Sequence, residues 1–426
     1  MPKNIVICCD GTGNQFGECN SNVVKLYTAL MINNDQVGYY HPGLGTMGSP
    51  TERTHLGKAW SKLKGLAFGA GFFDNIEDAY RYLMNQYNDG DQIYLIGFSR
   101  GAYTARALGA ILHAFGLLCK GNEGHFPYVL RMFMDGTRKM RRQNKRTLPV
   151  DEAFKETFSH NVTLRFVGVW DTVSSIGWIY EPIKLLYSAH NPSIQTGRHA
   201  MSIDERRCFY VDNLWGPSLA KEHTPDLEAE QDILQVWFAG VHSDVGGSYP
   251  QQESALANRA LKWILGEAIA AGIRVVPERV DMIFGRETKT KYAAADLFRR
   301  PVEPGSPHKS LSGAWWLLEF LPHRYYDKDD EKERWRIPIG RPRQIPDTAF
   351  IHPSAVERME DRSCNYRPTN LKRDKILPFC EVSRDVFEGG TGTKADLSEF
   401  HVYLSHGLPA RTTKIPKTGA VAGLVA

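Results

Sequence analysis

The residues GFSRG at positions 97–101 indicate the fold, because of the segments on either side of them. Residues 92–97 form an apolar run that predicts a buried strand, and residues 100–118 carry apolar side chains at the spacing of one helix face. A G-x-S-x-G sequence between a strand and a helix is typical of a nucleophile elbow, a sharp turn that presents its serine at the end of a sheet. A Cβ at either glycine would collide with the elements that meet there. We therefore predict that Ser99 is a nucleophile; a tight turn with an incidental serine is the alternative.

The segments around this turn predict strands that alternate with helices. Apolar runs predict strands at residues 4–9, 37–40, 164–170 and 235–241, and amphipathic patterns predict helices at residues 75–87 and 255–271. Continuous apolar runs are typical of strands that are buried on both faces of a parallel sheet. We therefore predict an α/β fold, with a mostly parallel sheet and helices on both faces. Beyond about residue 275 the alternation weakens, so we interpret residues 1–275 as a catalytic core and residues 276–426 as a loop-rich cap packed on it.

Composition excludes several classes of protein. The 426 residues are 42% hydrophobic and 23% charged, which is typical of a globular chain, and the formal net charge of +4 gives no reason to expect a nucleic-acid partner. The seven cysteines are scattered without a CxxC pair, which argues against a zinc ribbon or a disulfide framework and favours a reducing compartment. With no signal-peptide pattern and no apolar run of about 18 residues, we expect a cytoplasmic protein. Export without a cleaved signal is the alternative, and the oligomeric state is left open.

A serine nucleophile needs an acid, which in this architecture follows a later strand. Asp171 directly follows the predicted strand at residues 164–170. Asp204 and Asp226 are rivals, but neither follows a comparable apolar run. We predict Asp171 as the acid, with a turn-capping aspartate as the alternative.

The base is predicted to be His242, in the sequence AGVHSDVGG that follows the run at residues 235–241. Its flanking glycines suit a loop that bends sharply close to the serine. The serious rival is His406, after a short apolar run at residues 401–404. We expect one ring nitrogen of His242 to face Ser99 and the other to face Asp171, whose charge would raise the pKa of the imidazole.

The glycine-rich sequence DGTGN at residues 10–14 allows three interpretations. A phosphatase of the haloacid-dehalogenase type would carry its nucleophilic aspartate at position 8, where this chain has Cys8, and a dinucleotide fingerprint would need a third glycine. The remaining functional interpretation is an oxyanion hole, in which the N–H of Gly11 or Thr12 acts together with the Arg100 N–H at the start of the helix. A structural turn is the alternative.

Three other features of the sequence suggest binding sites. Asp10, His242 and Asp244 make only a weak metal pattern, and we predict no metal and no cofactor. Residues 315–322 (WWLLEFLP) suit an acyl pocket or a membrane surface, but a buried core helix is the favoured interpretation. The basic residues between positions 138 and 146 suit anionic head groups, but a solvated helix face is favoured.

Four motifs in this order resemble a known family; they lie at residues 10–12, 97–102, 169–173 and 240–247. The family is the uncharacterised α/β-hydrolase domain family that includes bacterial type VI secretion phospholipase effectors, and the resemblance covers residues 4–270. Residues 199–207 (HAMSIDERR) are similar to that family's helix between the acid and the histidine. The resemblance implies Ser99, Asp171 and His242 as a catalytic triad for ester hydrolysis.

We therefore predict a serine hydrolase that cleaves a carboxylic ester. Phospholipase activity is implied by the effector branch of the family, which makes a phospholipid acyl ester the further expectation. The expected partners are an ester or lipid substrate and, peripherally, a membrane surface. A non-catalytic interaction module built on a hydrolase fold is the alternative.

Overall fold

The structure is a computed structural model. It describes residues 2–14, 16–43, 71–142, 152–173, 177–178, 181–182, 185–216, 231–302, 305–313, 315–327, 332–346, 349–371, 377–382 and 400–404. Among these residues no helix is both long and apolar enough to cross a membrane.

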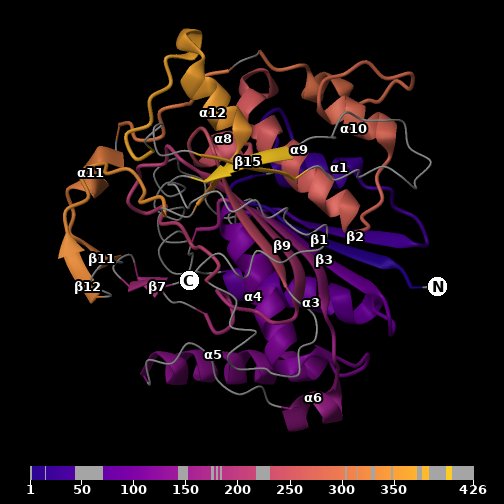
Figure 1. Cartoon of the computed structure of the whole chain (residues 1–426). Helices are drawn as coiled ribbons and strands as arrows, with labels where there is room; N and C mark the ends of the chain where they lie inside the picture. The colour runs from indigo at the N-terminus through magenta and orange to yellow at the C-terminus, as the bar shows by residue number, and fades with distance from the viewer. Residues whose placement is uncertain are drawn as a thin grey trace, which may run out of the picture.

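A nine-stranded sheet organises the chain, in the order β14-β15-β13-β10-β9-β6-β3-β1-β2 (Figure 1). The seven strands from β13 to β2 run parallel: β1 (Asn4–Cys9), β2 (Gln36–His41), β3 (Gln92–Phe98), β6 (Leu164–Trp170), β9 (Ile194–Ser202), β10 (Asp232–Phe238) and β13 (Phe350–Ile351). Two antiparallel strands, β15 (Phe400–Leu404) and β14 (Leu377–Val382), complete one edge. The predicted mostly parallel α/β fold is confirmed.

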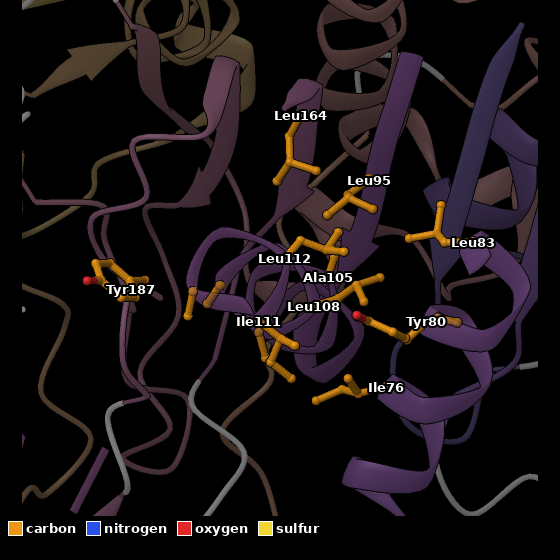
Figure 2. Close-up of a cluster of buried hydrophobic side chains, with 14 of the residues drawn as sticks. Ile76, Tyr80, Leu83, Leu95, Ala105, Leu108, Ile111, Leu112, Leu164 and Tyr187 are labelled. Carbon is orange, nitrogen blue, oxygen red and sulfur yellow. The ribbon is translucent and has the colours of Figure 1, made fainter. Parts of the chain in front are cut away.

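Helices cover both faces of this sheet. On one face lie α3 (Phe72–Gln86), α4 (Ser99–Phe115), α5 (Phe126–Arg142) and α6 (Glu152–Phe158), and on the other lie α1 (Asn22–Ala29), α9 (Ala255–Ala270) and α10 (Pro277–Ile283). Each set buries its own apolar core, and Figure 2 shows part of the first, where α3 packs against α4 and α4 packs on β3 and β6. Along β1, Ile5 and Ile7 enter the first core and Val6 and Cys8 enter the second. The continuous apolar run is therefore the mark of a strand with two buried faces.

The remaining elements are short. They are β4 (Leu117–Leu118), β5 (Ser159–His160), β7 (Gly177–Trp178), β8 (Glu181–Pro182), α8 (His242–Gly246), α11 (Trp315–Glu319), β11 (His323–Asp327), β12 (Lys332–Arg336) and α12 (Pro353–Glu360), with 3₁₀ turns at Glu123–His125, Gln251–Glu253, Ala295–Phe298 and Arg362–Cys364. The chain after residue 275 joins the sheet through β13, which pairs with β10. Ala355 and Met359 of α12 belong to a third apolar cluster, together with Trp237 of β10.

The helix expected within residues 199–207 is wrong, because residues 199–202 end strand β9 and residues 203–207 are irregular. β9 pairs in parallel with β6 on one side and β10 on the other, and runs from Ile194 to Ser202. Its Ala200 enters the second core and Met201 the third, on opposite faces. A segment that fills the centre of a parallel sheet must complete the ladder on both edges, which a helix cannot do.

The buried core helix favoured for residues 315–322 is also wrong. α11 leaves Leu317 74% exposed and Phe320, just beyond it, 59% exposed, whereas the only buried side chain on this helix is the acidic Glu319. The basic segment behaves as favoured where it is described: Arg138 on α5 is exposed and pairs with Asp135, one helical turn away. Residues 143–151 lie outside the described ranges.

A buried lysine gives a first testable prediction. Lys25 of α1 is fully buried, donates a hydrogen bond to the Asn258 amide oxygen over 3.1 Å, and has its pKa lowered to about 7 by burial. In the unfolded chain this lysine keeps its ordinary pKa of 10.5. Between about pH 7 and pH 10.5 the unfolded state therefore binds more protons than the folded state, so the free energy of unfolding rises with pH over this range. We expect Lys25→Met to raise the free energy of unfolding by roughly 2–4 kcal/mol near neutral pH.

Urea unfolding at about pH 6.5 and about pH 9.5 measures this effect, which should shrink at the higher pH. The matched control is Lys139→Met on the exposed surface of α5, which should change stability by less than about 0.5 kcal/mol. A Lys25→Met protein no more stable than wild type at the lower pH would contradict the prediction.

Candidate active site

The carboxyl ends of β1 and β3 meet at the point where the strand order reverses. The chain builds the sheet outward from β1 to β2 on one side, and from β3 onward to β10 on the other. In open parallel sheets this switch point is where ligands bind, because the loops leaving the two central strands diverge there. The DGTGN loop follows β1 and the elbow follows β3, so both predicted parts of the site lie at this point.

The predicted elbow at Ser99 is a sharp turn from strand to helix with a strained backbone. Ser99 is the first residue of α4, directly after β3, and has φ +57°, a left-handed conformation that non-glycine residues seldom adopt. A Cβ on Gly101 would lie 2.2 Å from the Cys9 carbonyl oxygen, and one on Gly97 would lie 2.6 Å from the Ala102 Cα. Both glycines are therefore required for the close approach of α4 to β1 and β3, as predicted.

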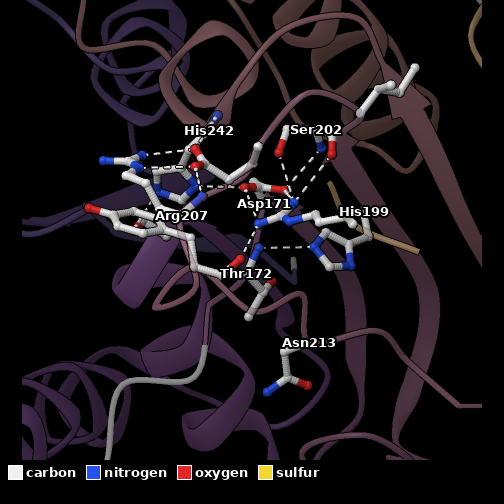
Figure 3. A network of polar contacts seen from close by, with 12 residues as sticks. Asp171, Thr172, His199, Ser202, Arg207, Asn213 and His242 are labelled. Atoms are coloured by element: carbon white, nitrogen blue, oxygen red, sulfur yellow. Dashed lines mark hydrogen bonds and ion pairs between the residues drawn. The ribbon is translucent and has the colours of Figure 1, made fainter. Parts of the chain in front are cut away.

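The structure brings Ser99, His242 and Asp171 together. His242 opens α8, the short helix after β10, and its Nε2 lies 2.8 Å from the Ser99 Oγ. The other ring nitrogen, Nδ1, lies 2.6 Å from the Asp171 Oδ2 (Figure 3). All three side chains are buried, with Ser99 retaining 7% exposure. The close packing of the histidine loop is visible at Gly246, where a Cβ would lie 1.8 Å from the Phe98 ring.

Asp204, one of the rival acids, makes its hydrogen bonds outside this cluster. The Asp204 carboxylate accepts hydrogen bonds from the Gly240 N–H at 2.6 Å and the Tyr366 hydroxyl at 2.8 Å. The Asp204 carboxylate therefore holds the loop that precedes His242 in place. Asp226 and His406 lie outside the described residues.

Around His242 lie residues that the sequence did not reveal as part of the site. The His242 backbone N–H donates to Glu205 at 3.2 Å, and Glu205 pairs with Arg207 at 2.8 Å. The Arg207 guanidinium lies 3.6 Å from the centre of the Tyr210 ring, and that ring packs edge-on against His242 at 4.7 Å. Glu205 and Arg207 belong to the HAMSIDERR segment, so the resemblance located them but assigned them to a helix.

Charge and burial act in opposite directions on the pKa values of the cluster. Burial disfavours the charged carboxylate of Asp171, but the Arg343 guanidinium and the hydrogen bond from His242 outweigh it and hold the pKa well below its usual range. Burial lowers the pKa of His242 below the ordinary 6.5, and the Asp171 carboxylate offsets this only in part. The expected upward shift of the His242 pKa is therefore wrong, because burial outweighs the neighbouring charge.

The DGTGN loop passes beside the elbow. A Cβ on Gly11 would lie 3.2 Å from the Ser99 Cβ. The Gly11 N–H donates to the Asp10 carboxylate at 2.6 Å, so of the two predicted donors from this loop the Thr12 N–H is the one with no acceptor among the described residues. Asp10 also accepts from Asn14, Ser21 and Tyr40, which fixes the loop.

The residues weighed as a metal site are engaged elsewhere. Asp244, two residues after His242, pairs with His308 at 2.6 Å. In the part of the chain that the structure describes, no group of three or more His, Cys, Asp or Glu side chains is arranged to hold a metal ion.

The mostly parallel sheet with helices on both faces is an α/β-hydrolase-like fold, which is shared by a broad class of proteins, and comparison with known proteins narrows that class. The model of the type VI secretion system phospholipase effector Tle1-like catalytic domain matches residues 3–267. The chain belongs to this family, a family of lipases and related hydrolases, and the predicted resemblance is confirmed.

Two further similarities were found. The uncharacterized protein YEL023C of Saccharomyces cerevisiae is 24% identical over 553 aligned residues, which cover 87% of this chain and 80% of the yeast protein. A crystal structure of an uncharacterized protein from Pseudomonas aeruginosa aligns with a TM-score of 0.40 and 17% identity, covering 71% of this chain. The chain spans 49% of the length of that structure.

Proposed function

We propose that this protein is a serine esterase that cleaves an acyl ester of a phospholipid, with Ser99, His242 and Asp171 as its catalytic triad. The observation that carries the proposal is the His242 ring, whose two nitrogens lie 2.8 Å from the Ser99 Oγ and 2.6 Å from the Asp171 carboxylate. A serine, an imidazole and a carboxylate in this order are the arrangement that activates a hydroxyl as a nucleophile.

In the first half of the reaction, the Ser99 Oγ attacks the acyl carbon while His242 Nε2 takes the hydroxyl proton. Asp171 accepts a hydrogen bond from the Nδ1–H and stabilises the imidazolium that forms. The Arg100 N–H in the first turn of α4 and the Thr12 N–H are the proposed donors to the oxyanion. Among the described residues neither N–H has a protein acceptor, so both are available for this role. The tetrahedral intermediate formed by this attack then releases the alcohol, which receives its proton from His242, and the acyl group stays on Ser99.

In the second half, water attacks the Ser99 acyl ester. His242 takes a proton from the water and returns it to the Ser99 Oγ, which releases the fatty acid and restores the starting state. The reaction consumes one water for each ester bond.

The lipid part of the proposal rests on the family and on an exposed apolar surface next to the site. Trp316, Leu317, Phe320 and Leu321 are 38–74% exposed. Trp315, at the start of the same helix, packs against Tyr210 with ring centres 5.7 Å apart. Tyr210 also packs against His242, so Tyr210 lies between this apolar surface and the proposed triad. We propose that it faces the lipid–water interface during turnover.

The test is a substrate panel on the purified full chain. We expect release of fatty acid and lysophospholipid from diacyl phospholipid vesicles, together with hydrolysis of short-chain aryl esters. Binding to vesicles without any product from either class would contradict the proposal and favour the non-catalytic interaction module.

The pH dependence provides a further prediction. Because burial lowers the pKa of His242, the imidazole stays neutral, and able to accept the serine proton, to a lower pH than an ordinary histidine does. We expect kcat/KM to fall on the acid side with a midpoint below 6.5. Initial rates on a soluble aryl ester between about pH 4 and about pH 8 measure it. A midpoint above 7 would mean that the Asp171 carboxylate outweighs burial.

A further inference from the structure

The carboxylate of Asp171, the proposed catalytic acid, is paired with Arg343, a buried arginine that lies outside the residues matched by the family. Arg343 Nη1 lies 2.5 Å from the Asp171 Oδ1, and Nη2 lies 3.0 Å from Oδ2. The pair is bidentate, with Asp171 fully buried and Arg343 8% exposed. The family match ends at residue 267, so Arg343 enters the site from the segment after it.

The same guanidinium donates hydrogen bonds to three residues of the site, Asp171, Ser202 and Tyr210. Its Nη1 donates to the Ser202 Oγ at 2.7 Å, and its Nη2 donates to the Tyr210 carbonyl at 2.6 Å. Ser202 in turn donates its backbone N–H to the Asp171 Oδ1 at 3.0 Å, and the Tyr210 ring packs on His242. The planar fork of an arginine can reach these acceptors at once, whereas a lysine ammonium has one donor centre.

The backbone of Arg343 is itself held in place by Asn370. Its carbonyl accepts a hydrogen bond from the Asn370 side chain at 3.0 Å, and the same amide donates to the Ile203 carbonyl at 2.9 Å. Ile203 directly follows β9, so the segment around Arg343 is fixed against the end of the central sheet. A fixed guanidinium can orient a carboxylate without loss of side-chain entropy at each turnover.

The charges around His242 form two matched pairs. The carboxylates that face it are Asp171, after β6, and Glu205, after β9, and they are paired with Arg343 and Arg207 respectively. On its own helix, Asp244 is paired with His308. Each negative charge near the imidazole thus has its own partner, which limits how far the carboxylates can favour the imidazolium form.

We propose that Arg343 is a positioning residue of this site, and that the segment after residue 267 therefore completes the catalytic unit. The inference rests on the proposed function. By fixing both oxygens of Asp171, Arg343 sets the direction from which the carboxylate meets the His242 Nδ1–H, and so the orientation of the imidazole toward Ser99. Its charge also balances that of Asp171, so that His242 remains a neutral base.

The test compares Arg343→Ala and Arg343→Lys with wild type in the full-length chain, using a soluble aryl ester. We expect Arg343→Ala to lower kcat by about 10²-fold with little change in KM, and to move the acid limb of the pH profile to higher pH. Guanidinium ion at about 50 mM, well below denaturing concentrations, should raise the kcat of the Arg343→Ala protein by about tenfold or more. Arg343→Lys, which keeps the charge but loses the fork, should lower kcat while moving the acid limb less.

Arg358→Ala is the matched control, because Arg358 is a buried arginine of the same C-terminal segment that donates to the Gly305 carbonyl and contacts no triad residue. It should show no shift of the acid limb and no response to guanidinium. An Arg343→Ala protein with wild-type pH dependence and no rescue would overturn the inference. If Arg343→Ala does not fold, an Arg343→Lys protein with wild-type kcat would overturn it. Wild-type protein without Ser99-dependent turnover would instead overturn the proposed function.

Discussion

Ser99→Ala is expected to lower ester turnover by about 10⁶-fold while the protein keeps its fold. No other described hydroxyl lies within hydrogen-bond distance of the His242 Nε2, so the variant has no substitute nucleophile. Among the described residues the Ser99 hydroxyl makes one hydrogen bond, and the side chain retains slight exposure, so alanine leaves no large cavity. The strained φ of +57° is shared by both proteins. Initial rates and the midpoint of urea unfolding measure the two parts of this prediction.

The matched control for the nucleophile is Ser363→Ala, at an exposed 3₁₀ turn where the Ser363 N–H donates to Asp361. It should retain full activity and stability. A Ser99→Ala protein that kept a tenth of the wild-type rate would show that another group is the nucleophile, and a Ser99→Ala protein that failed to fold would leave only the labelling experiment below to assign it.

Asp171→Asn is expected to cost about 10⁴-fold in kcat. The amide cannot serve as the charged acceptor for the His242 Nδ1–H, so the imidazole is presented to Ser99 in the wrong tautomer. The change also leaves the Arg343 guanidinium facing a neutral group in a buried site, so we expect a loss of stability as well. Rates are therefore compared per folded molecule, with the folded fraction measured by circular dichroism.

Asp204→Asn is the matched control for the acid. The Asp204 Oδ2 accepts from both Gly240 and Tyr366, and a single amide oxygen can accept the same two hydrogen bonds. It should lower kcat by less than about tenfold. Equal losses in the two variants, or a greater loss for Asp204→Asn, would reassign the acid.

The parts of the fold that the sequence predicted are those with a strong local signal. Strands such as β1 and β6 are continuous apolar runs, and the elbow is a short motif whose glycines have a steric reason. β9 was missed because its sequence, IQTGRHAMS, mixes polar and charged residues with small ones. Its Arg198 is fully buried only because it pairs with Asp232 of β10 and Glu267 of α9, an arrangement that depends on tertiary structure.

The same distinction applies to the site. Ser99, Asp171 and His242 each follow a predicted strand, so topology alone brings them to one edge of the sheet. Arg343 lies 172 positions after Asp171 with no motif around it, and nothing in the sequence marks it as a partner. The direction of the His242 pKa shift was missed for a related reason: the carboxylate could be inferred from the triad, but the extent of burial around the imidazole could not.

Covalent labelling of the purified full chain with a fluorophosphonate tests the central claim most directly, because this reagent reacts with a serine that a neighbouring imidazole activates. Peptide mapping by mass spectrometry should find one adduct per chain, on Ser99, with ester hydrolysis lost in proportion to labelling. The Ser99→Ala protein should take up no label. Hydrolysis that persists in protein fully labelled on Ser99, or an adduct on a different serine that abolishes it, would contradict the account.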